Sequence, residues 1–149
     1  MTKISDIQPT ESLAKTLNGV KLQISATETV RLRCYADNQM PNKGLGDEFF
    51  SAMVNGKTVS QTEPFQMFKG NVALGIYTKL RSDGTVNNVR LRKMIDMAVQ
   101  AADRKCSDGI FFEIDPTNVI TPTTTNLNTG YATKIINVAW HTTDSFHNS

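Results

Sequence analysis

Residues 71–114, NVALGIYTKLRSDGTVNNVRLRKMIDMAVQAADRKCSDGIFFEI, decide the fold of this chain. They begin with Asn71–Arg81, in which apolar residues at alternate positions predict a β-strand. From Thr85 to Lys105 the apolar residues recur with the period of an α-helix, and Ile110–Ile114 is again strand-like. Two Ser-Asp-Gly triplets should end the first strand and the helix, because Asp bonds its own backbone and Gly accepts a positive φ. A strand–helix–strand unit is therefore predicted.

The composition is typical of a single globular domain. The 149 residues are enough to bury roughly two thirds of the surface of the unfolded chain, so we expect one domain over residues 1–149. The net charge of +2 is too small for the concentrated basic surface of a dedicated nucleic-acid binder. No apolar run reaches the length of a membrane span, and residues 1–6 lack the apolar region of a signal peptide.

The N-terminal part predicts a short helix followed by a hairpin. Pro9–Leu17 has helical character, and Thr10 or Ser12 is a candidate N-cap. Val20–Ile24 and Val30–Tyr35 each alternate between apolar and polar residues, as two half-buried strands do. Together these two segments resemble an antiparallel hairpin.

The middle of the chain predicts a loop, a strand and a second loop. Asp37–Gly46 carries Pro and Gly breakers and is expected to be a loop. Asp47–Val54 is an aromatic-rich strand that should close at the Asn55-Gly56 turn signal. The polar segment Lys57–Gln66 is expected to be an exposed loop, across which this strand pairs with the strand at residues 71–81.

The C-terminal part predicts an arm and a last strand. Asp115-Pro116 should end the preceding strand, and the Thr-rich residues 117–130 are expected to form an extended arm or long loop. Tyr131–His141 carries apolar residues on both faces, which indicates a central strand or one covered by another subunit. The predicted fold class is α+β: a mostly antiparallel sheet with one main amphipathic helix, at about 85–105, and the short N-terminal helix packed against it.

Two carboxylates are the first candidates for chemistry. Glu113 and Asp115 lie two residues apart on one face of a predicted strand and are a candidate Mg²⁺ site. The other nearby carboxylates, Asp83 and Asp108, are accounted for as turn residues, and Asp115 as a strand stop before proline. The turn explanation is favoured, so no metal site is predicted.

Histidine and cysteine are the second candidates. His141 and His147 with Cys34 or Cys106 match no zinc spacing. Nothing beside Cys106 except Lys105 favours a reactive thiolate. Without CxxC spacing the two cysteines are expected to be reduced thiols, a single disulfide being the alternative. We therefore predict no catalytic residue, no cofactor and no enzymatic activity.

Nucleic-acid binding is the stronger rival hypothesis. Arg31, Arg33 and Tyr35 with Phe49 and Phe50 would suit a basic and aromatic sheet surface on which single-stranded bases stack. The two phenylalanines are nevertheless better explained as core residues, because the chain has few other large apolar residues. The two arginines are better explained as an ordinary solvated strand face.

The order of the predicted elements resembles a known family. A short N-terminal helix and a strand closing on Asn55-Gly56 precede Phe68–Tyr77, the amphipathic helix, Ile110–Ile114 and Thr133–Thr142. In this order, over about residues 47–143, the chain resembles the tail-terminator (tail-completion, or neck) proteins of tailed bacteriophages. The resemblance implies a small α+β protein without enzymatic activity. It also implies assembly in the host cytoplasm into a ring, commonly six-fold, that caps the tail tube beneath the head.

The hypothesis from the sequence is therefore a structural virion protein located in the tail or neck. Its expected partners are copies of itself, tail-tube proteins and head-connector or neck proteins, with weak sequence-independent contact to packaged DNA and no membrane. The expected interface residues are Phe65, Phe68, Val119, Ile120, Leu127 and Tyr131, and the expected lumen-facing residues are Arg31, Arg33, Lys79 and Arg81. The alternatives are a single-stranded nucleic-acid-binding protein and a metal-dependent nuclease.

Overall fold

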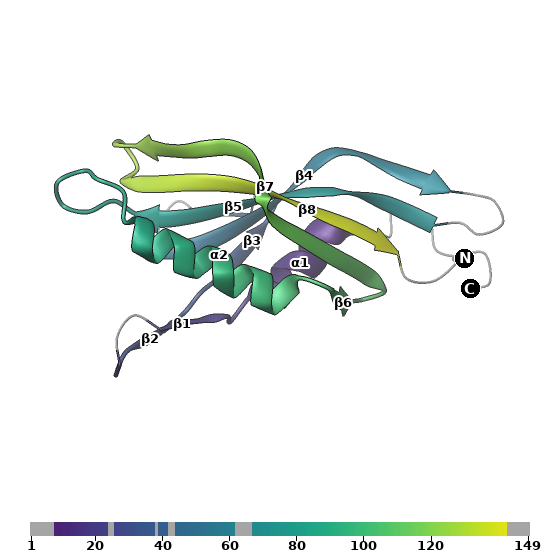
Figure 1. Cartoon of the computed structure of the whole chain (residues 1–149), viewed down its shortest axis with the longest axis horizontal. Helices are drawn as coiled ribbons and strands as arrows, with labels where there is room; N and C mark the ends of the chain where they lie inside the picture. Colours follow the sequence, from purple (N-terminus) through teal and green to yellow (C-terminus); the bar gives the residue numbers. More distant parts are fainter. Residues whose placement is uncertain (1–7, 24–25, 38, 42–43, 62–66, 143–149) are drawn as a thin grey trace.

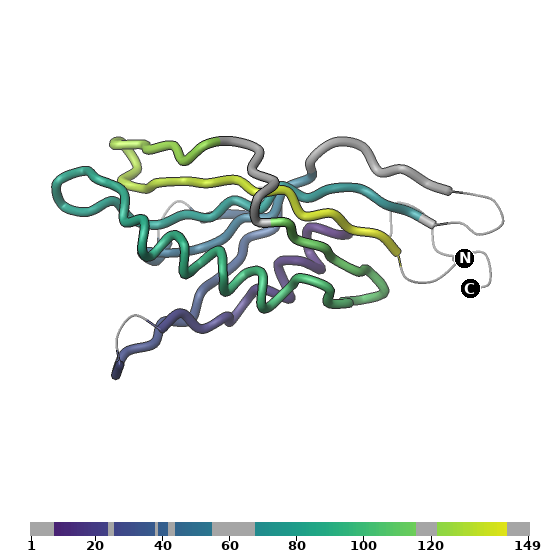
Figure 2. Tube along the Cα trace, viewed as in Figure 1, coloured from purple at the N-terminus to yellow at the C-terminus, as the bar shows by residue number. Residues whose placement is uncertain are grey.

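The structure, a computed structural model, describes residues 8–23, 26–37, 39–41, 44–61 and 67–142. Within these ranges it describes residues 55–61, 67 and 116–121 by their backbone alone. Two helices and a small ribbon lie on one side of a long twisted sheet, as the chain trace shows (Figures 1 and 2). No helix in the described part of the chain is both long enough and apolar enough to cross a membrane.

Six strands form the sheet in the order β3–β4–β5–β8–β7–β6. Neighbouring strands are antiparallel except β3 and β4, which are parallel. A separate antiparallel ribbon joins β1 (Lys21–Gln23) to β2 (Thr29–Arg31). The strands of the sheet are β3 (Cys34–Ala36), β4 (Glu48–Gln61), β5 (Met67–Lys79), β6 (Lys105–Ser107), β7 (Ile110–Asn126) and β8 (Tyr131–Thr142).

The helices α1 (Pro9–Leu17) and α2 (Asn88–Ala102) cover the same face of this sheet. The α1 helix packs against β3 and β4, and α2 packs against β5 and β7. Across the covered face, Val72, Val138 and Ile114 lie side by side on β5, β8 and β7, and all three are buried. The predicted α+β class, the main helix and the short N-terminal helix packed against it are confirmed.

The helix boundaries differ from the sequence prediction at their caps. The residue before α1 is Gln8, and no side chain caps this end. The hydroxyl of Thr10 instead donates to Asp37 Oδ2 at 2.7 Å, which ties the helix to the end of β3. The α2 helix begins later than Thr85 because Asn87 caps it, accepting from the Arg90 amide at 3.2 Å.

Two predicted strand ends are wrong in the first half of the chain. Val30–Tyr35 is not one strand: Leu32 donates its amide to Val20 in the ribbon, whereas the carbonyl of Arg33 accepts from Phe50 in the sheet. The chain thus passes from β2 to β3 at this point. Asn55-Gly56 does not turn the chain either, because β4 continues to Gln61 with a register shift between Asn55 and Val59. Part of the loop predicted at residues 57–66 is therefore strand, and residues 62–66 lie outside the described residues.

Two further ends are wrong in the second half. The second Ser-Asp-Gly triplet does not end the helix. Its Ser107 ends β6, and Asp108 and Gly109 form the two-residue turn to β7, with φ of 53° at Asp108 and 78° at Gly109. Asp115-Pro116 does not end β7, and residues 117–126 are not a free arm. They pair with β8 through three register shifts, and Pro116 and Pro122 both fall at such a shift, where β7 has no paired residue in β8.

Candidate functional site

One face of the sheet carries no helix. Residues alternate across a strand, so those between the core positions of β4, β5 and β8 point away from α1 and α2. Phe49, Tyr77 and Thr133 make one row across this face, and Ser51, Gly75 and Ile135 make the next. We call it the open face.

Aromatic rings fill one end of the open face. Phe49 is only 2% exposed although it points away from the helices. It stacks on Tyr77 with ring centroids 4.5 Å apart and meets Tyr131 and Tyr35 edge to face at 5.2 and 5.9 Å. The Tyr131 hydroxyl donates to the Gly46 carbonyl at 2.8 Å, which holds the end of the 37–46 loop against this cluster. Burial, with help from the nearby charges of Asp47 and Glu48, raises the pKa of Tyr131.

The middle of the open face is small and polar. A Cβ atom at Gly75 would lie 2.5 Å from Ser51 Oγ, so the Ser51 side chain occupies the space that a side chain at position 75 would need. Further along, Asn137 Nδ2 donates to Asn71 Oδ1 at 2.8 Å. Met53 stands at the β4 side of this region and is 46% exposed. The open face is therefore uncharged through the centre of the sheet.

The two outer edges of the sheet are only partly paired. On one side, β3 covers β4 from Phe50 to Ala52, and the rest of β4 has no further neighbour among the described residues. On the other side, β6 covers β7 from Ile110 to Phe112, and β7 beyond that is also an outer strand. Figure 1 shows these free halves at opposite ends of the sheet, that of β7 at the upper left and that of β4 at the upper right.

These edges also carry exposed apolar side chains. Val54, immediately beyond the β3-covered part of β4, is 63% exposed, and Leu127, in the turn after β7, is 76% exposed. Residues 116–133 contain no Lys, Arg, Asp or Glu, and this is the longest uncharged run in the chain. Natural proteins commonly protect a free strand edge with charge, especially lysine. A free edge without charge indicates a binding surface for another strand.

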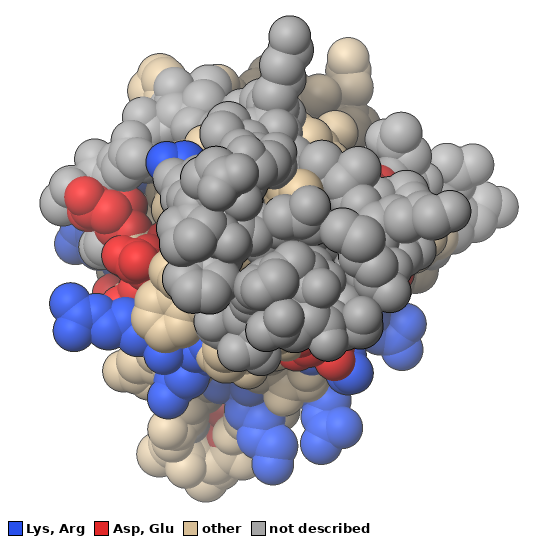
Figure 3. Space-filling model, turned by 90° about the vertical axis from the view of Figure 1, so that its right-hand side faces the viewer, with Lys and Arg blue, Asp and Glu red and all other residues tan. Residues whose placement is uncertain are grey.

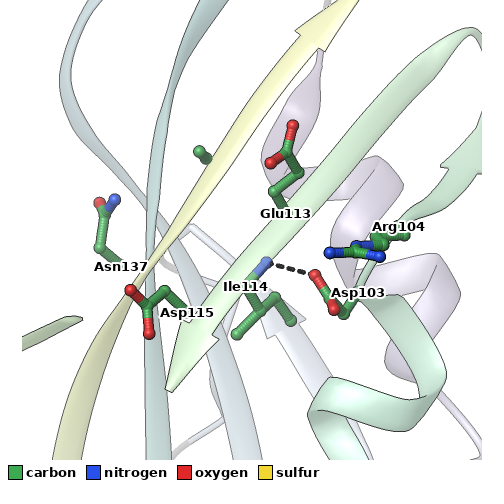
Figure 4. A pocket seen from close by; sticks show the side chains of 7 residues that line it. Asp103, Arg104, Glu113, Ile114, Asp115 and Asn137 are labelled. Carbon is green, nitrogen blue, oxygen red and sulfur yellow. Dashed lines mark hydrogen bonds between the residues drawn. The ribbon is translucent and has the colours of Figure 1, made fainter. Parts of the chain in front are cut away.

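The carboxylates from the sequence do not gather into one centre. A pocket of about 350 Å³ lies between β7 and the end of α2, lined by Asp103, Arg104, Glu113 and Asp115, among others (Figure 4). Asp103 Oδ1 accepts a hydrogen bond from the Ile114 amide at 2.8 Å, and this bond links the end of α2 to β7.

The other two carboxylates are engaged away from this pocket. Asp83 accepts from the Thr85 amide and hydroxyl, which together hold the pKa of Asp83 below its usual value. Asp108 lies 3.6 Å from the Lys15 ammonium. The described residues contain no group of three or more His, Cys, Asp or Glu placed to hold a metal ion.

The cysteine and histidine candidates are also separated. Cys34 is buried in the helix-covered core, and burial raises the pKa of its thiol to about 12, so it holds almost no thiolate at neutral pH. Cys106 is exposed, and both cysteines are free thiols, as expected. His141 lies against the ring of Phe111 at 5.1 Å, and His147 is outside the described residues. No arrangement of a thiol with an activating histidine follows from these positions.

The predicted basic and aromatic surface is divided. Phe49 and Phe50 point to opposite faces of β4 and both are buried, so their expected use in packing is confirmed. Arg31 lies on the exposed ribbon, whereas Lys79 ends β5 and pairs with Asp47 at 3.8 Å. Viewed from the right-hand end of Figure 1, Lys and Arg side chains gather on the lower side, the side of the helices and ribbon (Figure 3). Exposed cations of the helices and the ribbon region are Lys15, Lys21, Arg31, Arg33, Arg92 and Lys93.

The predicted interface residues lie in different environments. Phe68 is 8% exposed and packs in the core, so it offers little surface. Tyr131 is half-buried in the aromatic cluster, while Leu127 is open to solvent. Val119 and Ile120 lie in β7, where the structure describes only their backbone. Phe65 lies outside the described residues. The edges of the sheet were expected to contribute to an interface, but which parts of them are free, and that one face carries no helix, follow from strand order, which no local pattern encodes.

Comparison with known proteins adds no relative. No family model matches the chain, and neither does any curated protein. The function must therefore be argued from the geometry.

Proposed function

We propose that this chain is a structural virion protein of a tailed phage that forms a ring, terminating or completing the tail and joining it to the head or neck. Its neighbours in this proposal are other copies of itself, the tail-tube proteins below and the connector or neck proteins above. The proposal joins the resemblance in element order to the geometry of the sheet.

The observation that carries the proposal is the pair of free strand edges on opposite sides of one sheet. The β4 edge beyond Ala52 and the β7 edge at residues 122–126 differ in sequence and in location. Two different surfaces that bind each other give a head-to-tail contact, and a head-to-tail contact closes into a ring when its rotation divides a full turn. A single self-complementary patch would give only a dimer.

The arrangement of the other side chains supports a non-enzymatic role. The base-stacking hypothesis needs exposed rings, but Phe49 and Phe50 are buried. The nuclease hypothesis needs carboxylates that converge, but Asp83 and Asp108 are engaged in turns and ion pairs away from Glu113. Glu113 and Asp115 share a pocket with Asp103, but Asp103 is bonded to the Ile114 amide, and the described residues contain no group of three or more His, Cys, Asp or Glu that could hold a metal ion.

DNA contact remains a secondary part of the proposal. Arg31, Arg33, Lys79 and Arg81 are all exposed, and in a ring they would give weak, sequence-independent contacts with DNA passing through the lumen. The ribbon and the end of β5 lie toward the same end of the molecule in Figure 1, which is compatible with one shared lumen.

Electron microscopy of the purified chain and of the parent particle tests the proposal. We expect rings of uniform diameter at high protein concentration, or the protein at the junction of head and tail when particles are labelled with an antibody. Because such rings can require a tail tip for assembly, purified tail tubes should be added to protein that is monomeric alone. A chain that neither forms rings, nor binds tubes, nor occurs in particles would disprove the proposal.

A further inference from the structure

We infer that neighbouring copies join strand to strand, with the outer edge of β7 at residues 122–126 added to the outer edge of β4 that begins at Met53. This inference rests on the ring proposed above and names the surfaces that build it. In the resulting ring the sheet of one copy continues into the sheet of the next.

The backbone of both edges is already held in strand conformation. An outer strand presents a row of N–H and C=O groups that can form hydrogen bonds with another strand. The β7 strand is paired with β8 through Thr124–Asn126, so this segment is held in strand conformation and its outer edge is offered to a partner. The β4 strand is similarly held by β5 at Met53 and Val54, just where β3 ends.

Within one chain the two edges cannot reach each other. β5 and β8 lie between β4 and β7. At a spacing of about 4.8 Å per strand, β4 and β7 are about 14 Å apart across the sheet. The two free segments are also displaced along it, because Met53 and Val54 pair with residues 72–73 of β5, whereas residues 124–126 pair with the part of β8 that lies beside residues 77–79 of β5. Neither edge has a partner strand among the described residues, and a second copy supplies both partners at once.

The side chains at the two edges are exposed and mostly uncharged. Residues 124–126 of β7 are exposed, and no residue between 116 and 133 is charged. Pro122 has no N–H to donate, so the bonds that β7 donates to a partner strand begin after it. Met53 and Val54 are 46% and 63% exposed on opposite faces of β4. The free part of β4 contains one charged residue, Lys57, and that of β7 at residues 122–126 contains none. Pairing the two edges would cover the apolar side chains of Met53 and Val54, and burial of apolar surface favours association.

Cysteine cross-linking tests this arrangement. In a Cys106→Ser background, one chain carries Val54→Cys and a second, differently tagged chain carries Thr125→Cys; both positions are exposed, and buried Cys34 is left in place. With a short bis-maleimide, we expect the mixture to give heterodimer in roughly tenfold excess over either variant alone, because pairing raises the effective concentration of the two thiols. Val54→Cys mixed with Gln100→Cys, on the exposed side of α2, is the matched control.

Lysine substitutions give a second measurement. Val54→Lys or Thr125→Lys should block ring assembly, because each puts a charge at the contact, whereas Gln100→Lys should leave rings intact. Circular dichroism of each variant shows that the monomer is folded. Two outcomes would overturn the inference while leaving the ring proposal standing. One is rings that form while the Val54→Cys and Thr125→Cys chains do not cross-link to each other. The other is rings in which either single variant cross-links to itself. Absence of both rings and cross-links when purified tail tubes are present would remove both.

Discussion

The carboxylate of Glu48 lies on the helix-covered face of β4, where the guanidinium of Arg90 in α2 pairs with it. The side chains are 5% and 23% exposed, so this ion pair is largely removed from solvent. It fixes the first turn of α2 to the first residue of β4, at the same end of the sheet as the Asn87 cap. A buried charge that loses its partner is costly, so we expect the pair to matter for stability.

We predict that Arg90→Met lowers the free energy of unfolding by about 2–3 kcal/mol, because it leaves the Glu48 carboxylate buried and unpaired. Urea unfolding followed by circular dichroism measures the change. Arg92→Met, an exposed position on the same helix, is the control and should cost less than about 0.5 kcal/mol. The double variant Glu48→Leu, Arg90→Met should regain part of the loss. Equal stabilities of the two single arginine variants would show that the pair contributes nothing.

Individual strands and helices were predictable where one face is buried and the other is not. β5, α2 and β8 emerged from periodicity because the helix-covered core selects apolar residues such as Val72, Met94 and Val138 at regular spacing. The predictions failed at strand ends. Asn55-Gly56 and Asp115-Pro116 are turn signals in isolation, but long-range pairing with β5 and β8 absorbs them as irregularities within strands.

The candidate site was less predictable than the fold for the same reason. Leu127 was expected at an interface and is exposed, whereas Phe68 was also expected there and is buried in the core. Both are apolar residues in polar surroundings of the sequence. Which of them is covered depends on the neighbouring strand, and strand order is set by the whole sheet. The Thr-rich residues 117–126 were recognised as unusual, but their role as an outer strand required that order.

Hydrogen exchange should separate the inner and outer strands. β8 is paired on both sides, whereas β7 at residues 122–126 is paired on one side and follows three register shifts. Local opening costs less free energy where fewer contacts and bonds must break. We predict that amides of residues 132–141 exchange far more slowly than those of residues 122–126 in the monomer, measured by mass spectrometry of peptic fragments. Equal exchange in the two segments would contradict the strand order described above.

At the scale of the whole molecule, charge and shape favour an assembly protein over a nucleic-acid binder. The net charge of the chain is only +2. Several of its exposed Lys and Arg residues lie on the side of the helices and ribbon and not on the open face. The open face, where a sheet-based binder would stack bases, instead has Phe49 buried among three tyrosines. Any attraction to DNA must then come from dispersed phosphate contacts, which are weak and sensitive to salt.

We therefore predict that a labelled single-stranded oligonucleotide binds the monomer with a Kd weaker than about 10⁻⁴ M at physiological salt. Fluorescence anisotropy measures this, and any binding at low salt should disappear as salt is added, because released counterions drive it. Arg31→Gln with Arg33→Gln should reduce the low-salt binding, while Gln100→Ala, which changes no charge, should not. Submicromolar binding that survives physiological salt would require exposed base-stacking groups and would favour the single-stranded nucleic-acid-binding alternative over the ring.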